Sequence, residues 1–135
     1  MTVQHSTAVR NARLDVWEST IGTSAILKIR TGAQPANCAA ADSGTVLATC
    51  NLPSDWMAAA SGGVKAKSGT WEDTSADATG TAAHYRIYAS DGTTCHEQGT
   101  VTATGGGGDM TVDNTSFAAG QPFTVTAFSK TAAGA

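Results

Sequence analysis

The chain has 135 residues, the length of one domain, with a formal net charge of −3 at pH 7 and charged side chains at only 14% of positions. The small residues Ala, Thr, Gly and Ser fill 72 of the 135 positions, which predicts a thin core. The low fraction of charged residues, together with the Thr, Val and aromatic residues, predicts a folded β-rich domain. The eight Lys and Arg residues are scattered and no window approaches the roughly 20 apolar residues that span a bilayer, so we expect neither nucleic-acid nor membrane partners.

Residues 1–22 differ from the rest of the chain and are predicted to form an N-terminal helix or arm. Apolar residues recur there at spacings of three and four, which is typical of one face of a helix. They are Val9, Ala12, Val16, Trp17 and Ile21. Ser6 or Thr7 can cap the start of this helix, and Gly22 is placed to end it. Two roles remain open for the apolar face, because it could pack on the chain's own sheet or dock on a neighbouring subunit.

The next segments read as strands separated by loops. Residues 24–30 alternate apolar and basic side chains, which predicts a strand, and a loop over 31–43 leads to a second strand over 44–52. Pro53 ends that strand, and residues 53–58 could start a single helical turn. Alternation then resumes over residues 64–72, followed by a turn-rich stretch.

A hairpin is the clearest feature of the second half. Its arms are residues 83–88 and 93–104, and Asp91-Gly92 suits a two-residue turn in which both central residues have positive φ. The four glycines 105–108 are predicted to make a wide turn before a last pair of strands, over 110–113 and 123–129. The tail from residue 131 has no visible anchor.

This order of elements predicts an all-β fold. Seven or eight short strands spaced about ten residues apart, without helix alternation, favour an antiparallel β-sandwich, jelly-roll-like or otherwise, and argue against a parallel fold. We therefore expect an N-terminal helix or arm over 1–22 and one sandwich domain over 23–135.

The three cysteines allow a disulfide but do not require one. Cys38 and Cys50 flank a turn-rich stretch and could close a short loop, which would leave Cys95 unpaired. Residues 1–20 lack the apolar segment of an export signal, and cytosolic thiols are normally reduced, so the disulfide is the less favoured alternative. A zinc site made of the three cysteines with His84 or His96 has no supporting spacing, and we expect no metal or cofactor.

No constellation of residues predicts an enzyme. Cys95, His96 and Glu97 are adjacent on a predicted strand and therefore point to alternate faces, which prevents a nucleophile–base pair. Asp73 and Asp77 lie in a turn-rich stretch and are better explained as turn residues than as paired catalytic carboxylates.

Four aromatic residues support two interpretations. Trp56, Trp71, Tyr85 and Tyr88 could line a sugar-binding site, or they could supply the bulk that a core of Ala and Thr otherwise lacks. The second interpretation is favoured, and a carbohydrate-binding module that uses Trp56, Trp71 and Tyr88 stays as an alternative function.

Three stretches resemble small structural proteins of tailed bacteriophages. They are NARLDVWESTIG at 11–22, GTAAHYRIYASDGT at 80–93 and GGGDMTVDN at 106–114. Within that group the chain is most similar to head decoration or cement proteins, which are small β-sandwich proteins on the outer capsid. The resemblance implies a location on the capsid exterior of the virion after synthesis in the host cytoplasm, with the major capsid protein and further copies of this chain as partners.

The expected function is therefore a non-enzymatic virion protein that binds and stabilises the capsid lattice. Because aromatic and Arg residues dominate interface energetics, the arm is where we expect its contacts. The candidate partner-binding residues are Val9, Arg10, Arg13, Leu14 and Trp17. A tail, neck or fibre component is the nearest alternative.

Overall fold

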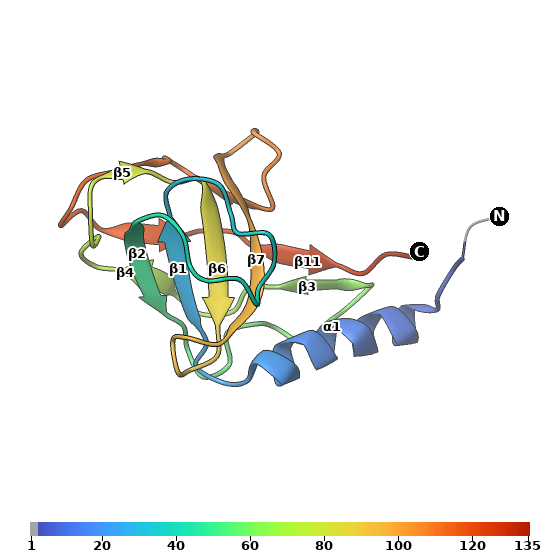
Figure 1. Ribbon diagram of the computed structural model, residues 1–135. Coiled ribbons are helices and arrows are strands. Elements are labelled where there is room, and N and C mark those ends of the chain that lie inside the picture. Colours follow the sequence, from blue (N-terminus) through green and yellow to red (C-terminus); the bar gives the residue numbers. More distant parts are fainter. Residues whose placement is uncertain (1–2) are drawn as a thin grey trace.

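The computed structural model describes residues 3–135 as a mostly β protein with one helix (Figure 1). A curled five-stranded sheet has the order β2-β1-β6-β7-β8, and three two-stranded pairs, β10-β4, β11-β3 and β5-β9, accompany it. The elements are α1 (Thr7–Ile21), β1 (Ile26–Arg30), β2 (Val46–Asn51), β3 (Val64–Ala66), β4 (Trp71–Asp73), β5 (Gly80–Thr81), β6 (His84–Tyr88), β7 (Cys95–Ala103), β8 (Met110–Val112), β9 (Ser116–Phe117), β10 (Phe123–Val125) and β11 (Ser129–Thr131). Within these residues, α1 does not have the length and apolar character of a membrane-crossing helix.

Strands β1 and β6 lie at the centre of the main sheet. They pair antiparallel, with Leu27 opposite Ile87 and Ile29 opposite Tyr85, so these four side chains share one face. All four are at most 1% exposed. The alternation seen in the sequence therefore builds the face that becomes the hydrophobic core.

Aromatic rings link the helix to this core face. Trp17 packs edge-on against Trp56 with ring centroids 5.2 Å apart, Trp56 lies 5.9 Å from Trp71, and Phe128 follows at 5.5 Å from Trp71. Tyr85 on β6 completes the series 5.9 Å from Phe128. These large side chains supply the volume that Ala and Thr cannot, as the core interpretation of the tryptophans predicted.

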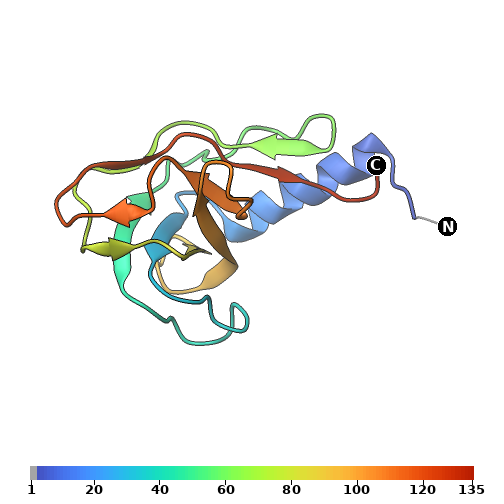
Figure 2. The same cartoon turned by 90° about the horizontal axis from the view of Figure 1, so that it is seen from above.

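Two of the short pairs, β10–β4 and β5–β9, contribute to the core face. Trp71 of β4, Val125 of β10 and Phe117 of β9 belong to the same buried cluster as Leu27 and Ile29. In Figures 1 and 2 the red and green segments of β11 and β3 run alongside α1 and beyond the main sheet. The β10–β4 and β5–β9 pairs are thereby anchored in the core, whereas the β11–β3 pair is attached to α1 through Lys65.

The segment 53–58 contains no helical turn, so that prediction is wrong. Its backbone instead pairs with residues further along the chain, because Trp56 O accepts from Ser68 N at 3.0 Å and Met57 forms a bridge with Lys67. Burial of both Trp56 and Met57 on this extended segment outweighs the local preference for a turn. The strand predicted over 64–72 is likewise divided into β3 and β4.

The β6–β7 hairpin is confirmed, but its two-residue turn is not. Ala89 N donates to Thr94 O, which closes a four-residue loop, and Gly92 has positive φ while Asp91 does not. The Asp91 carboxylate accepts from the backbone N–H groups of Thr93 and Thr94, each at 2.9 Å. This side-chain turn replaces the predicted geometry, and a bulge after Ile87 adjusts the register.

One strand pair is parallel, which the antiparallel prediction did not include. Val101 to Ala103 of β7 pair with Met110 to Val112 of β8. The glycine-rich loop between them returns the chain over Thr102, whose hydroxyl accepts from Gly108 N at 3.0 Å. Gly108 fits because a Cβ there would collide with Thr102.

The C-terminal tail is anchored, contrary to expectation. Strand β11 pairs with β3, and beyond it Ala132 N donates to Gly63 O at 3.0 Å. His5 N donates to Gly134 O at 2.7 Å, so the segment before α1 lies beside the end of the tail.

Candidate functional site

The helix α1 carries two apolar stripes and not the single face that the spacing suggested. Leu14 and Ile21 are buried, and Trp17 packs half-buried against the core. Val9 and Val16 lie on the neighbouring side and are 45% and 60% exposed. Both groups follow spacings of three and four. They nevertheless lie on different sides of the helix, because each residue is rotated by about 100° from the one before it.

Polar contacts fix the inner side of the helix. Arg10 is 9% exposed, and its Nε donates to Ala132 O at 3.0 Å. Its guanidinium lies over Gly63, where a Cβ would collide with it, and Gly63 N donates to Asn11 Oδ1 at 2.8 Å. Arg10 therefore joins the helix, the β3 turn and the C-terminal tail.

A buried lysine adds a second attachment. Lys65 of β3 lies 2.7 Å from Asp15 Oδ1 and 2.8 Å from Glu18 Oε1, while its side chain is 2% exposed. Burial alone would lower the pKa of Lys65, but the hydrogen bonds with Asp15 and Glu18 outweigh it and raise that pKa. The hydrogen bond from Lys65, and then that from Ala60 N, lowers the pKa of Asp15. The charged forms are thus the stable ones, which holds this end of the helix firmly.

The side of α1 that faces away from these attachments is exposed to solvent. Val9, Ala12, Arg13 and Val16 line one shallow depression on α1, and its surface is almost entirely apolar. Of the residues predicted to bind a partner, Val9 and Arg13 lie there, whereas Arg10, Leu14 and Trp17 are committed to the chain's own packing. We call Val9, Ala12, Arg13 and Val16 the outer stripe.

The site prediction omitted Ala12 and Val16. Both are placed on the predicted apolar face by the i, i+3, i+4, i+7 spacing from Val9 to Val16, but they are not among the candidate contacts. Arg10 and Leu14 interleave with that pattern, and only tertiary packing shows which of the two series faces inward.

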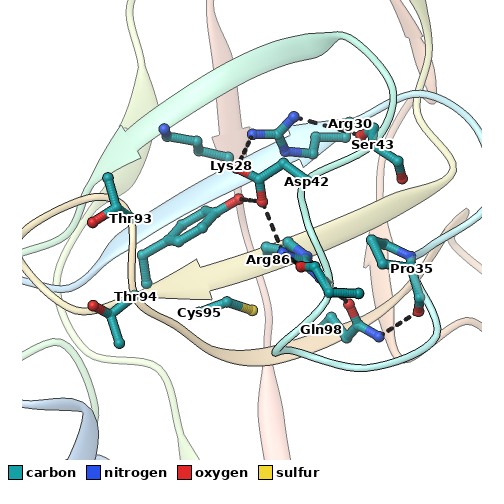
Figure 3. A network of polar contacts seen from close by, with 12 residues as sticks. Lys28, Arg30, Pro35, Asp42, Ser43, Arg86, Thr93, Thr94, Cys95 and Gln98 are labelled. Carbon is teal, nitrogen blue, oxygen red and sulfur yellow. Dashed lines mark hydrogen bonds and ion pairs between the residues drawn. The ribbon is translucent and has the colours of Figure 1, made fainter.

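A second cluster of charge lies on the other face of the main sheet, where residues 31–45 cover it (Figure 3). Arg86 on β6 donates to Asp42 Oδ1 at 2.8 Å, to Asn37 O at 2.9 Å and to Gln98 Oε1 at 2.9 Å. Arg30 on β1 pairs with Asp42 Oδ2 at 3.1 Å. The two guanidiniums thus share one carboxylate and bind carbonyl oxygens of the covering loop.

Tyr88 and His84 complete this cluster. Desolvation would raise the pKa of Asp42, but hydrogen bonds from Tyr88 and Arg86 and the charge of Arg30 lower it overall. His84 is fully buried, and its Nδ1 lies 2.7 Å from Gly32 O, which requires Nδ1 to be the donor. Burial, together with Arg30 and Arg86, lowers the pKa of His84, so the neutral imidazole is favoured. The cluster fastens the loop to the sheet.

The cysteines are distributed over both faces of the sheet, and all three are free. Cys50 lies opposite Leu27 on the core face, whereas Cys38 belongs to the loop over the other face, so a Cys38–Cys50 disulfide cannot form across the sheet. Burial first, and then nearby carboxylates, raises the pKa of Cys50 to about 12. Burial and a hydrogen bond with Cys38 raise the pKa of Cys95 to about 12. The thiol is therefore the stable form of both residues.

The remaining candidates have structural partners. Trp56, Trp71 and Tyr88 are each 0% exposed, so none of them can stack on a glycan. Asp73 Oδ2 accepts from Thr49 N at 2.9 Å, and Asp77 accepts from the Thr49 hydroxyl at 2.8 Å. These carboxylates fasten the stretch after β4 to the edge of β2.

Comparison with protein-family models, with curated proteins and with solved structures finds no match for this chain.

Proposed function

We propose that this chain is a non-enzymatic structural protein of a tailed-bacteriophage virion that binds the outer capsid lattice and stabilises it. The sequence resemblance to decoration proteins motivates the proposal. The observation that carries it is the outer stripe: Val9 and Val16 are 45% and 60% exposed on a helix whose inner side is fixed by Arg10 and Lys65. An apolar surface held rigidly in water loses little entropy when a partner covers it.

The proposed mechanism is burial of the outer stripe against the major capsid protein. One helix face buries less area than a stable interface requires, so the proposal includes symmetric self-association of the chain on the lattice. Arg13 supplies a charged group at the rim of the stripe, where it would select an acidic patch on the capsid. The proposed location is the capsid exterior, reached after synthesis in the host cytoplasm.

We further propose that the architecture is a jelly-roll-like β-sandwich, antiparallel except for the β7–β8 pair, in which the three short strand pairs form the second layer. The buried cluster that joins the main sheet to β4, β9 and β10 supports this assignment. A tail, neck or fibre component remains the alternative virion role. The carbohydrate-binding alternative loses its proposed residues, since Trp56, Trp71 and Tyr88 are fully buried.

The first test is the copy number of this chain in purified particles from its source, measured by mass spectrometry relative to the major capsid subunit. A ratio near one, or a simple fraction of one, is expected for lattice decoration. A handful of copies would assign the chain to the neck, tail or fibre, and its complete absence would exclude a virion role.

The second test asks whether the outer stripe makes the contact. Capsids lacking this chain are mixed with the wild-type protein or with the double variant Val9→Ser/Val16→Ser, and bound copies are counted after sedimentation. We expect the double variant to lose at least tenfold in affinity. Val64→Ser, which removes an apolar side chain 39% exposed on β3, is the matched control and should bind normally. Equal binding of the double variant would place the interface elsewhere.

A further inference from the structure

A cleft of about 290 Å³ lies beside β9 and β10. Strand β9 pairs with β5, and in both views this end of the molecule lies away from α1 (Figures 1 and 2). The residues that the argument uses are Asp113, Asn114, Phe117, Gln121, Pro122 and Phe123. None of them belongs to the outer stripe, so the cleft is a separate feature.

Two phenylalanines form the apolar part of the cleft. The rings of Phe117 and Phe123 lie 4.7 Å apart at 45°, and both pack against the main core. Phe117 is 5% exposed and Phe123 is half-buried, so their positions are set by the fold before any ligand arrives. Pro122 extends this apolar surface beside Phe123.

The turn that carries Gln121 is also fixed. Ala76 N donates to Gln121 O at 2.8 Å, and Gly120 N donates to Ala76 O at 2.8 Å. Gln121 N closes the turn by donating to Ala118 O at 3.0 Å. The cleft is thus preorganised on both its apolar and its polar sides, which reduces the entropy lost on binding.

The polar groups have a defined orientation. Asn114 Oδ1 accepts from Ser116 N at 2.9 Å, and Gln121 Oε1 accepts from Ala118 N at 3.4 Å. Because both amide oxygens are used by the backbone, the two NH₂ groups are the sides left to donate. The Asp113 carboxylate beside them is an acceptor.

This combination selects one class of ligand. A pyranose ring presents an apolar C–H face for the half-buried Phe123, whose ring packs on the buried Phe117, together with neighbouring hydroxyl groups that both donate and accept hydrogen bonds. The described residues that line the cleft include Asp113 but no Lys, Arg or His, so an anionic ligand would meet repulsion without compensation. We infer that the cleft binds a neutral saccharide residue, at about the size of one or two sugar rings given the lower limit of ligand pockets.

The test is a titration of the ¹⁵N-labelled full chain with glucose, galactose, mannose and N-acetylglucosamine, followed by amide chemical shifts. We expect at least one of these sugars to shift amides of residues 113–124 with a dissociation constant on the order of 1 mM. Sialic acid and glucuronate are included as anionic probes and should bind at least tenfold more weakly.

The variants Asn114→Asp and Gln121→Glu remove the NH₂ donors but keep the oxygens that accept from the backbone. Each should weaken sugar binding at least fivefold without altering shifts outside the cleft. Asn51→Ala, at an exposed position on β2, is the matched control and should bind as wild type. Phe123→Leu keeps the apolar volume but removes the ring, and should also weaken binding.

Several outcomes would overturn the inference. They are the absence of shifts at residues 113–124 with all four neutral sugars, shifts confined to another surface, or tighter binding of the anionic probes. Normal sugar binding by Val9→Ser/Val16→Ser is expected, because that variant alters only the outer stripe. Failure of the capsid proposal and failure of the saccharide site would therefore be seen in different experiments.

Discussion

The two faces of the five-stranded sheet are both covered, but by different physical means. The core face buries Leu27, Ile29 and Ile87 beneath Trp56 and Trp71, and its stability comes from removal of apolar surface from water. The opposite face carries basic side chains of β1 and β6 beneath residues 31–45, and its stability comes from charge-assisted hydrogen bonds to carbonyl oxygens and one carboxylate.

This difference explains why every residue of β6 is buried although its sequence alternates. Tyr85 and Ile87 point to the core, while His84, Arg86 and Tyr88 point to the loop. A thin core of small residues limits what one apolar face can contribute. The second face adds order to a long loop by satisfying its carbonyl groups, so the molecule uses both sources of stability.

Breaking the core face should have the largest effect. Trp71→Ala removes a fully buried ring that contacts Trp56 and Phe128, and we expect a loss of about 3–5 kcal/mol in the free energy of unfolding, measured by urea denaturation. Trp71→Phe keeps a ring but removes the Nε1 donor to Trp56 O, so its loss should be smaller. A loss for Trp71→Ala no larger than that of Trp71→Phe would contradict this ranking.

Breaking the loop-covered face should cost less. Asp42→Asn preserves shape but leaves Arg30 and Arg86 without their shared negative charge, and because the Asp42 side chain is 40% exposed we expect a loss of about 1–3 kcal/mol. Asp55→Asn at an exposed position is the control and should change stability by less than about 0.5 kcal/mol. Equal effects of the two substitutions would mean that the Arg–Asp cluster contributes nothing.

The smallest expected effect is a pH dependence of the free energy of unfolding that comes from the loop-covered face. His84 lies in the loop-covered face and its pKa in the folded state is below the ordinary 6.5. As the pH falls below 6.5 the unfolded chain gains a proton that the folded chain resists, so stability present above pH 6.5 is lost as the pH approaches the lower folded pKa.

His84→Asn retains a donor for Gly32 O but cannot titrate. The wild type should therefore lose stability between pH 7 and pH 5 more steeply than His84→Asn, by at most about 1.4 kcal/mol per pH unit. The measurement is the urea midpoint at each pH, and the same pair compared between about pH 7.5 and 8.5 is the control, since His84 is neutral there in both states. Parallel pH profiles over the whole range would contradict the assignment of His84.

Local sequence signals located most elements. Helix α1 runs between the two predicted caps. At its start the Ser6 side chain accepts a hydrogen bond from Val9 N, and at its end Gly22 has a positive φ. Alternation likewise located β1, β2 and β6. These features depend on neighbouring residues only, which is why they can be inferred without a structure.

Features that depend on distant residues were wrong or missing. The segment 53–58 is extended because its backbone pairs with residues 66–68, and the tail is ordered because Arg10 and Gly63 bind it. The cleft beside β9 and β10 joins residues whose shared orientation comes from the separate strand partners β5 and β4. No local pattern contains such information.

The sequence by itself determined a single β-rich chain with one helix, few charges and a scarce supply of large side chains. Only the tertiary structure decided which helix stripe faces inward, since Val9/Val16 and Leu14/Ile21 have the same spacing. Lys65 binds Asp15 and Trp56 packs on Trp17, and these contacts turn the side with Leu14 and Ile21 toward the core. The physical reason is that helix and strand periods are properties of the local backbone, whereas burial is a property of what the rest of the chain places opposite.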